Sequence, residues 1–212
     1  VRHADEQGRS FRQRQAVVQC LRDSSITAII GGHHRTSEEC TRRAVAVNRS
    51  DEIRPELERE LGAALTQINE LSAGRDLMIR ALQTFEARGD RLGAGRTLDD
   101  IGCLHLRTGE LERARDSLSR AVALLTELGV PSLLARPYHN LGLVEKTLGH
   151  LDSAYDHHMS ALAIHLSAGD SRRASLAHDA LGNLTRVMGR QADTMAHYQE
   201  ALRLAREGGY RN

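Results

Sequence analysis

The feature that most constrains the fold of this chain is an internal repeat with a constant step of 40 residues. Four sets of residues keep this step in the same register. They are Leu61-Gly62, Ile101-Gly102, Leu141-Gly142 and Leu181-Gly182; Asn69, Gly109, Gly149 and Gly189; Ala81, Ala121, Ala161 and Ala201; and Gly89, Gly129, Gly169 and Gly209. Four coincident sets identify a repeat protein, in which each unit packs only on its neighbours.

Each repeat is predicted to be a pair of amphipathic helices. In the third repeat, apolar side chains recur at steps of three and four from Tyr138 to Leu148, which is typical of a helix with one buried face. Gly149 follows where a residue with positive φ closes a helix, and Asn69, the next-best residue for that conformation, takes the same place in the first repeat. Gly142 leaves room for a second helix to approach closely.

The sequence therefore predicts an all-α fold, with one helix on either side of each turn. The expected helices are Pro55–Ile68, Ser72–Arg88, Ala94–Arg107, Leu111–Leu128, Ala135–Leu148, Leu151–Ala168, Arg172–Met188 and Ala192–Glu207. Pro137 is expected in the first turn of its helix, where a proline removes no hydrogen bond. The expected units are 1–53, 54–93, 94–133, 134–172 and 173–212. The first of these holds a degenerate repeat at about residues 14–53 with Gly31-Gly32 at its turn.

These positions resemble the tetratricopeptide repeat (TPR). Its consensus places a large residue, Leu-Gly, a small residue, an aromatic residue and Ala in order, and the third repeat fills these places with Tyr138, Leu141-Gly142, Ala154, His158 and Ala161. The other repeats give Leu98, Ile101-Gly102, Ala114, Leu118 and Ala121, and then His178, Leu181-Gly182, Thr194, Tyr198 and Ala201. The consensus Trp and Pro are missing, and the step is 40 residues rather than the usual TPR length.

The long repeat is similar to the sensor regions of bacterial transcriptional regulators and signal-transduction ATPases. The resemblance implies a right-handed α-solenoid that acts as a non-catalytic protein- or peptide-binding module, either the regulatory part of such a regulator or an adaptor. In this family the first helix of each pair lines the concave face.

The resemblance thus selects as ligand-binding candidates the side chains that flank each Leu-Gly pair. They are Arg96, Asp99, Asp100, Cys103 and Arg107; Arg136, His139, Asn140, Leu143 and Lys146; and Asp179, Asn183 and Arg186, preceded in the first repeat by Arg59, Glu60 and Ala63. A carboxamide can donate to and accept from a peptide backbone at once, so Asn140 and Asn183 are the leading candidates. The alternative is that all of these are ordinary solvated residues. The family's carboxylate clamp is only partly matched, because Arg59 and Ala63 replace its first-repeat lysine and asparagine.

An enzyme on the same scaffold is the competing hypothesis. His139 near Asp99, Asp100 and Asp179 could act as a general base, as in a secondary-metabolism enzyme, but the sequence has no nucleophile elbow, phosphate loop or metal triad. Metal ligation is not expected either. His157 and His197 share one repeat position on successive helices, about 10 Å apart by helix packing, too far to share an ion. His158 and His165 fall on the packing stripe, and no cofactor is predicted.

Composition sets the expected partners. The formal net charge is +1, so no strong field favours direct nucleic-acid contact. No apolar run has membrane-spanning length, and the three cysteines form no CxxC pair, which favours a cytoplasmic protein without membrane contact. Val1 opens the chain, as in a GTG start or a fragment of a longer protein.

The last expected helix keeps an apolar face. Met195, Tyr198 and Leu202 fall at the spacing that packs onto a following repeat. We therefore expect self-association through this C-terminal face, most simply as a homodimer, or docking of the face on another domain.

Overall fold

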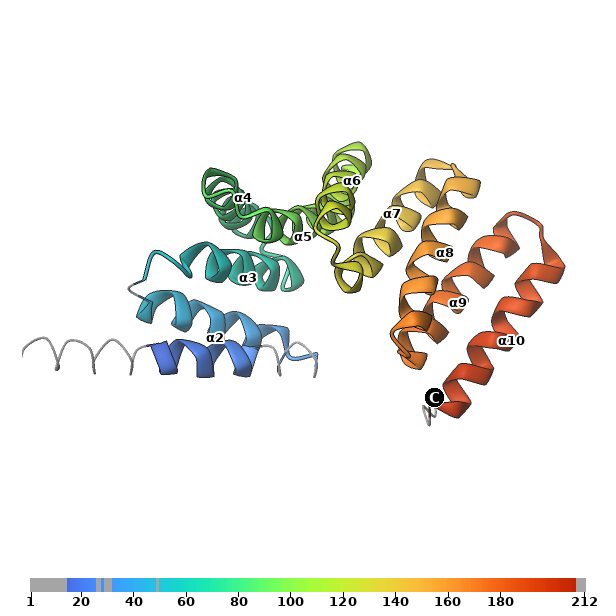
Figure 1. The fold of residues 1–212 in the computed structure, drawn as a ribbon, viewed down its shortest axis with the longest axis horizontal. Helices are drawn as coiled ribbons and strands as arrows, with labels where there is room; N and C mark the ends of the chain where they lie inside the picture. The colour runs from blue at the N-terminus through green and yellow to red at the C-terminus, as the bar shows by residue number, and fades with distance from the viewer. Residues whose placement is uncertain (1–14, 26–27, 29–31, 49, 209–212) are drawn as a thin grey trace, which may run out of the picture. The chain divides into compact units, whose positions relative to one another are not determined.

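The computed structural model describes residues 15–25, 28, 32–48 and 50–208. Within these ranges every regular element is a helix and no strand occurs, so the all-α prediction is confirmed. Residues 15–25 are helical. The later helices, shown in Figure 1, are α2 (His34–Val47), α3 (Arg54–Gln67), α4 (Leu71–Ala87), α5 (Arg91–Thr108), α6 (Leu111–Glu127), α7 (Ala135–Leu148), α8 (Leu151–Ser167), α9 (Ser171–Val187) and α10 (Gln191–Glu207), with a 3-10 turn η1 (Pro131–Leu133) before α7. Gly31 and Gly209, for which turn positions were predicted, lie outside the described residues.

The observed helices agree with the predicted ones to within a few residues. The largest difference is at α5, which begins at Arg91 rather than Ala94. Its first turn is held by Asp90, whose carboxylate accepts a hydrogen bond from the backbone N–H of Gly93 at 2.8 Å. Pro137 is the third residue of α7, in the first turn as predicted.

The turns explain the 20-residue spacing of helix ends. Among the described residues, Asn69, with φ 69°, is the one non-glycine residue of positive φ, and glycines take the equivalent position in the later repeats. Gly149, with φ 89°, closes α7 in the left-handed conformation. Glycine adopts this conformation without strain, so the predicted helix stops are confirmed.

The chain divides into two compact units, residues 1–100 and 101–212, with the boundary inside α5. In the first unit, Val18, Ala44 and Leu57 form a small core shared by the helix at 15–25, α2 and α3. Buried hydroxyls add to it: the Oγ of Ser25 lies 2.8 Å from both the Oγ of Ser37 and the Oγ1 of Thr41. These contacts join the N-terminal segment into a helical hairpin. The repeat boundaries within each unit stay predictions.

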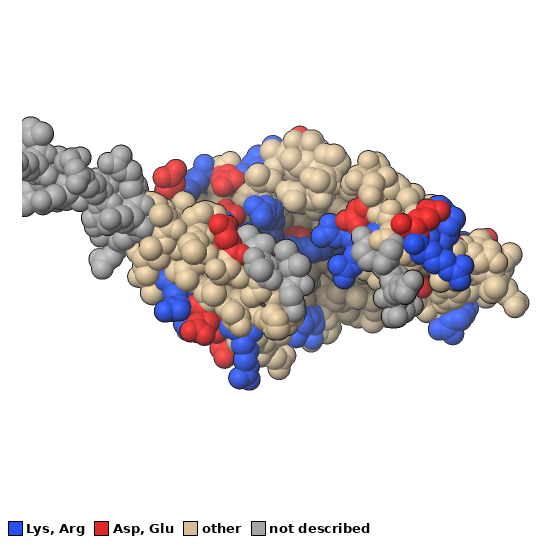
Figure 2. Space-filling view, turned by 90° about the horizontal axis from the view of Figure 1, so that it is seen from below, with Lys and Arg blue, Asp and Glu red and all other residues tan. Residues whose placement is uncertain are grey.

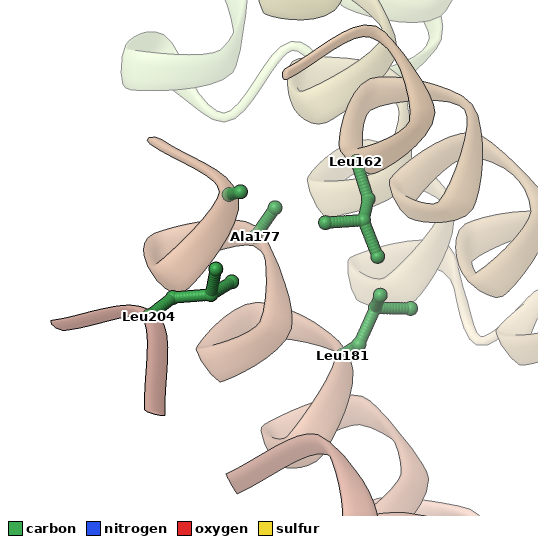
Figure 3. Packing of buried hydrophobic residues seen from close by; sticks show 5 residues of the cluster. Leu162, Ala177, Leu181 and Leu204 are labelled. Atoms are coloured by element: carbon green, nitrogen blue, oxygen red, sulfur yellow. The ribbon is translucent and has the colours of Figure 1, made fainter. Parts of the chain in front are cut away.

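In the second unit, each helix packs on its sequence neighbours from α6 to α10. Figure 3 shows Leu162 of α8 facing Ala177 and Leu181 of α9, with Leu204 of α10 on the other side of α9. The cluster is thin, because small residues such as Ala177 leave little space between the helices. It therefore holds α9 between α8 and α10 and fixes which side of α9 remains exposed.

The Leu-Gly glycines are points of close approach between the two helices of a repeat. A Cβ at Gly62 would lie 2.6 Å from the Cγ of Met78, and a Cβ at Gly182 would lie 2.6 Å from the ring of Tyr198. Gly102 meets Leu118 and Gly142 meets His158 in the same way. The second helix thus sends its aromatic-position side chain into the space that each glycine leaves open.

Candidate peptide-binding face

Two neighbouring first helices of the second unit present matched side chains. On α7, His139, Leu143 and Lys146 follow one another at steps of four and three, which places them on one side of the helix. On α9, the residues 40 positions later, which are Asp179, Asn183 and Arg186, do the same. All six side chains are exposed or half-buried, and we call them the α7–α9 face.

Apolar side chains continue this face. Leu143 is 39% exposed, while Leu176 and Val187 on α9 are 61% and 53% exposed. Leu176 lies three residues before Asp179, and Val187 directly follows Arg186. The face therefore offers both apolar area and charge, the combination that binding surfaces use for affinity and orientation.

Both asparagines that were predicted to hold a peptide backbone make intramolecular hydrogen bonds. The Nδ2 of Asn140 donates to the Sγ of Cys103 at 3.0 Å. Asn183 donates from Nδ2 to the backbone carbonyl of Asp179 and accepts from the Oη of Tyr198, each at 3.0 Å. These bonds fix the orientation of each carboxamide, and a ligand would use the second N–H of each amide nitrogen and the capacity that remains on the amide oxygens.

His139 stands beside the imidazole of His158. Its ring centroid lies 5.1 Å from that of His158, at an interplanar angle of 57°. Desolvation lowers the pKa of His139, and the charge of His165 lowers it further. His139 is therefore neutral at pH 7, with one nitrogen able to donate and the other able to accept a hydrogen bond.

Three first helices of this unit carry a cation in their last turn. These are Arg107 in α5, Lys146 in α7 and Arg186 in α9. A cation at this end of a helix is favoured by the helix dipole. Arg136 is also exposed and lies in the first turn of α7.

The candidates in the first unit are placed differently, because they belong to a largely buried ionic network. Arg59, 7% exposed, donates from Nη1 to the Oδ2 of Asp100 at 2.8 Å, and Asp100 itself is 5% exposed. Burial works against the charge of Arg59, but the carboxylates of Asp100, Glu56 and Glu60 together outweigh it, and the pKa of the guanidinium is raised. Glu56 accepts from both Arg59 and Arg96 at 3.3 Å.

The same network ties α3 to the N-terminal helix. Arg22 donates from Nε and Nη2 to the two carboxylate oxygens of Glu60, at 3.0 and 2.7 Å. Asp99 is 4% exposed, and Ala63 is half-buried. The buried carboxylate of Asp100 links α5 to α3 through Arg59, whereas most of the open positions of the predicted site lie on α7 and α9.

The histidines form pairs in the second unit. His158 is 3% exposed, as predicted for a core residue, and desolvation together with neighbouring positive groups lowers its pKa to about 4. His178 and His197 place their Nδ1 atoms 3.1 Å apart, and the ring of His157 stacks on Tyr138 with centroids 6.0 Å apart. In the described part of the chain, no group of three or more His, Cys, Asp or Glu side chains is placed to hold a metal ion.

Sequence reasoning assigned Tyr198 to packing and missed its second role. Its ring fills the space beside Gly182, while its hydroxyl reaches Asn183 and orients a residue of the α7–α9 face. The signal was present in the sequence: the equivalent positions hold Met78, Leu118 and His158, and only a tyrosine combines ring volume with a hydroxyl at its far end.

None of the described helices is both long enough and apolar enough to cross a bilayer. Figure 2 shows scattered groups of Lys and Arg atoms and of Asp and Glu atoms among uncharged residues.

Comparisons with known proteins agree with this architecture. No protein-family model matches the sequence, and no curated protein matches it either. Among solved structures, BtubC (BKLC) from P. vanneervenii is 17% identical, with a TM-score of 0.74 over 97% of this chain and 93% of that one. A kinesin light chain with TPR-like repeats from Podospora anserina is 12% identical, with a TM-score of 0.70 over 92% of this chain and 97% of its own.

The Rap conjugation gene regulator of plasmid pLS20, solved with the Phr* peptide, is 19% identical with a TM-score of 0.75. The match covers 88% of this chain but 52% of the regulator, so this chain spans about half the length of that protein. With sequence identities below 20%, these TM-scores show the fold alone. The chain is a TPR-like helical-repeat protein.

Proposed function

We propose that this chain is a non-catalytic protein- or peptide-binding module that takes its ligand on the α7–α9 face. The observation that carries the proposal is the match between α7 and α9, where residues 40 positions apart stay open to solvent. The equivalent positions in the first unit are less open: Arg59 is buried in an ion pair with Asp100, Asp99 is 4% exposed, and Ala63 is half-buried. A surface left open on two adjacent repeats suits an extended ligand that crosses both helices.

The similarity to a peptide-bound regulator supports a peptide as the ligand class. We further propose a regulatory or adaptor role, as the sensor part of a larger bacterial transcriptional regulator in the cytoplasm. In that role the chain itself would contact protein rather than nucleic acid, consistent with its net charge of +1.

The test is a peptide-display selection against the wild-type chain, followed by fluorescence anisotropy with the enriched peptides. Leu143→Glu buries a charge under any ligand seated on the α7–α9 face, so it should weaken binding at least about tenfold. Leu166→Glu is the matched control, because Leu166 is 50% exposed on α8, a second helix.

Equal loss of affinity in both variants would place the ligand elsewhere, and failure to enrich any peptide would contradict the proposed function. Circular dichroism of both variants checks that the helices remain folded. Turnover of a small molecule that is lost in His139→Ala would instead favour the enzyme hypothesis.

A further inference from the structure

The cations of the α7–α9 face differ from the other arginines of their unit. Elsewhere in this unit, exposed arginines are commonly used in ion pairs. Arg173 pairs with Asp170 at 3.0 Å, Arg190 with Asp152 at 2.8 Å, and Arg203 with Glu207 at 2.6 Å. By contrast, the described residues supply no ion-pair partner for Lys146 or Arg186, nor for Arg107 on α5, the first helix of the preceding repeat.

These cations also outnumber the anions around them. Of the six residues that define the α7–α9 face, two are cationic and one, Asp179, is anionic. His139 is neutral at pH 7 because its pKa is lowered by desolvation and by His165. It therefore adds no charge to the α7–α9 face. Lys146 and Arg186 occupy the same repeat position on successive first helices, so their charges lie along one line across the array.

Apolar side chains accompany each cation. Leu143 precedes Lys146 by one helical turn, and Val187 directly follows Arg186, with 39% and 53% of their side chains exposed. A ligand that matches both features carries carboxylates next to aliphatic side chains. Water would be displaced by the aliphatic groups, and the carboxylates would then meet the cations in a less polar setting, where ion pairing is stronger.

We infer that the ligand of this face is an acidic peptide in which carboxylate side chains alternate with aliphatic ones. The inference rests on the proposed function and adds the chemical class of the ligand. The carboxylates pair with Lys146 and Arg186, and with Arg107 when the peptide extends toward α5. The aliphatic side chains contact Leu143 and Val187.

The experiment compares three labelled peptides of equal length by fluorescence anisotropy. One alternates leucine with glutamate, one replaces each glutamate by glutamine, and one replaces each glutamate by lysine. The glutamate peptide should bind at least about tenfold more tightly than the glutamine peptide at low salt. This advantage should shrink as ionic strength rises, because salt screens exposed charges.

Charge reversal on the protein locates the effect. Lys146→Glu and Arg186→Glu should each lower the affinity for the glutamate peptide about tenfold. Both should change the affinity for the glutamine peptide little. Arg206→Glu is the matched control, because Arg206 is an exposed cation in the last turn of α10, a second helix, and gives the same change in net charge. Lys146→Arg should retain binding of the glutamate peptide.

Each remaining outcome overturns the inference. Equal affinity for all three peptides, preference for the lysine peptide, or equal loss of binding in Arg206→Glu would show that the ligand is not selected by these cations. If none of the three peptides binds, the inference also fails. The proposed function is then judged separately by the display selection and the Leu143→Glu variant, which presuppose no acidic ligand.

Discussion

Gly142 lies directly against the imidazole of His158 where α7 meets α8. A Cβ at Gly142 would stand 2.7 Å from the Cε1 of this ring, closer than carbon atoms approach without displacement. His158 is 3% exposed and has little space to retreat. The glycine therefore sets the separation of the two helices in the third repeat, as Gly182 does against Tyr198 in the fourth.

Gly142→Ala should lower the free energy of unfolding by about 1–3 kcal/mol, because overpacking exceeds the gain in helix propensity. Urea denaturation followed by circular dichroism measures the change. Combining Gly142→Ala with His158→Ala supplies space for the added methyl group, so the double variant should lose less than the sum of the two single variants. Additive losses would show that the two residues do not limit each other.

His158 should make stability fall at acidic pH. An unfolded histidine takes up its proton near pH 6.5, whereas folded His158 does so only at about 4. The lowered pKa means that the fold favours the neutral ring, so this contribution is complete above pH 6.5 and is lost as the pH falls toward 4. The loss is on the order of 3 kcal/mol for this residue.

Urea midpoints between pH 7 and 4 test this contribution. His158→Leu, which copies Leu118 of the second repeat, should show a shallower decline than the wild type. Parallel curves for the two proteins would mean that His158 takes up its proton at an ordinary pH in the folded chain.

Removing only one partner of the Arg59–Asp100 ion pair should lower the free energy of unfolding. Asp100→Asn leaves a buried guanidinium without its closest carboxylate, which typically lowers the free energy of unfolding by about 3 kcal/mol. Replacing both partners by apolar residues, as in Arg59→Met with Asp100→Leu, should recover much of that loss. A double variant as unstable as Asp100→Asn would contradict this account.

Asn69 is the one described position where a side chain is held at positive φ. Asn69→Gly should raise the free energy of unfolding by about 0.5–1 kcal/mol, because glycine removes the strain of the left-handed conformation. Asn69→Ala should lower it by about 1 kcal/mol, since alanine has no side-chain polar group to compensate. Thermal melting of both variants in the same buffer gives the comparison, and equal shifts would refute the conformational explanation.

The exposed side of α10 leads us to predict self-association. Leu162 of α8 is 3% exposed because α9 covers it, whereas its repeat equivalent Leu202 is 48% exposed, and Met195 nearby is 55% exposed. Sedimentation should show association that increases with concentration and is lost in Leu202→Glu but kept in Leu166→Glu. Tyr198→Arg is less suitable, because Tyr198 packs on Gly182 and bonds to Asn183. A strictly monomeric wild type would rule the idea out.

Much of this fold could be predicted because its determinants are local. Gly149 ends a helix through its own backbone preference, and the step-40 pattern repeats that preference along the chain. The ionic network of Arg59 and Asp100 could not be predicted, since it depends on which face of α3 meets α5, and sequence periodicity leaves that choice open. The hydrogen bond from Tyr198 to Asn183 was likewise hidden, because it depends on the depth at which a ring enters the space beside a glycine.

The regular spacing of the positive-φ residues also bears on how such a chain can change its length. From Asn69 to Gly189 they recur every 20 residues, so each helix with its turn has the same length and presents its buried face at the same positions. A single inserted residue would rotate every later side chain of its helix by about 100° and turn buried leucines toward water. Gain or loss of a complete 40-residue helical pair keeps every buried side chain facing its neighbouring helix. Lineages of this protein should therefore differ in length by whole helical pairs, with smaller changes confined to the turns.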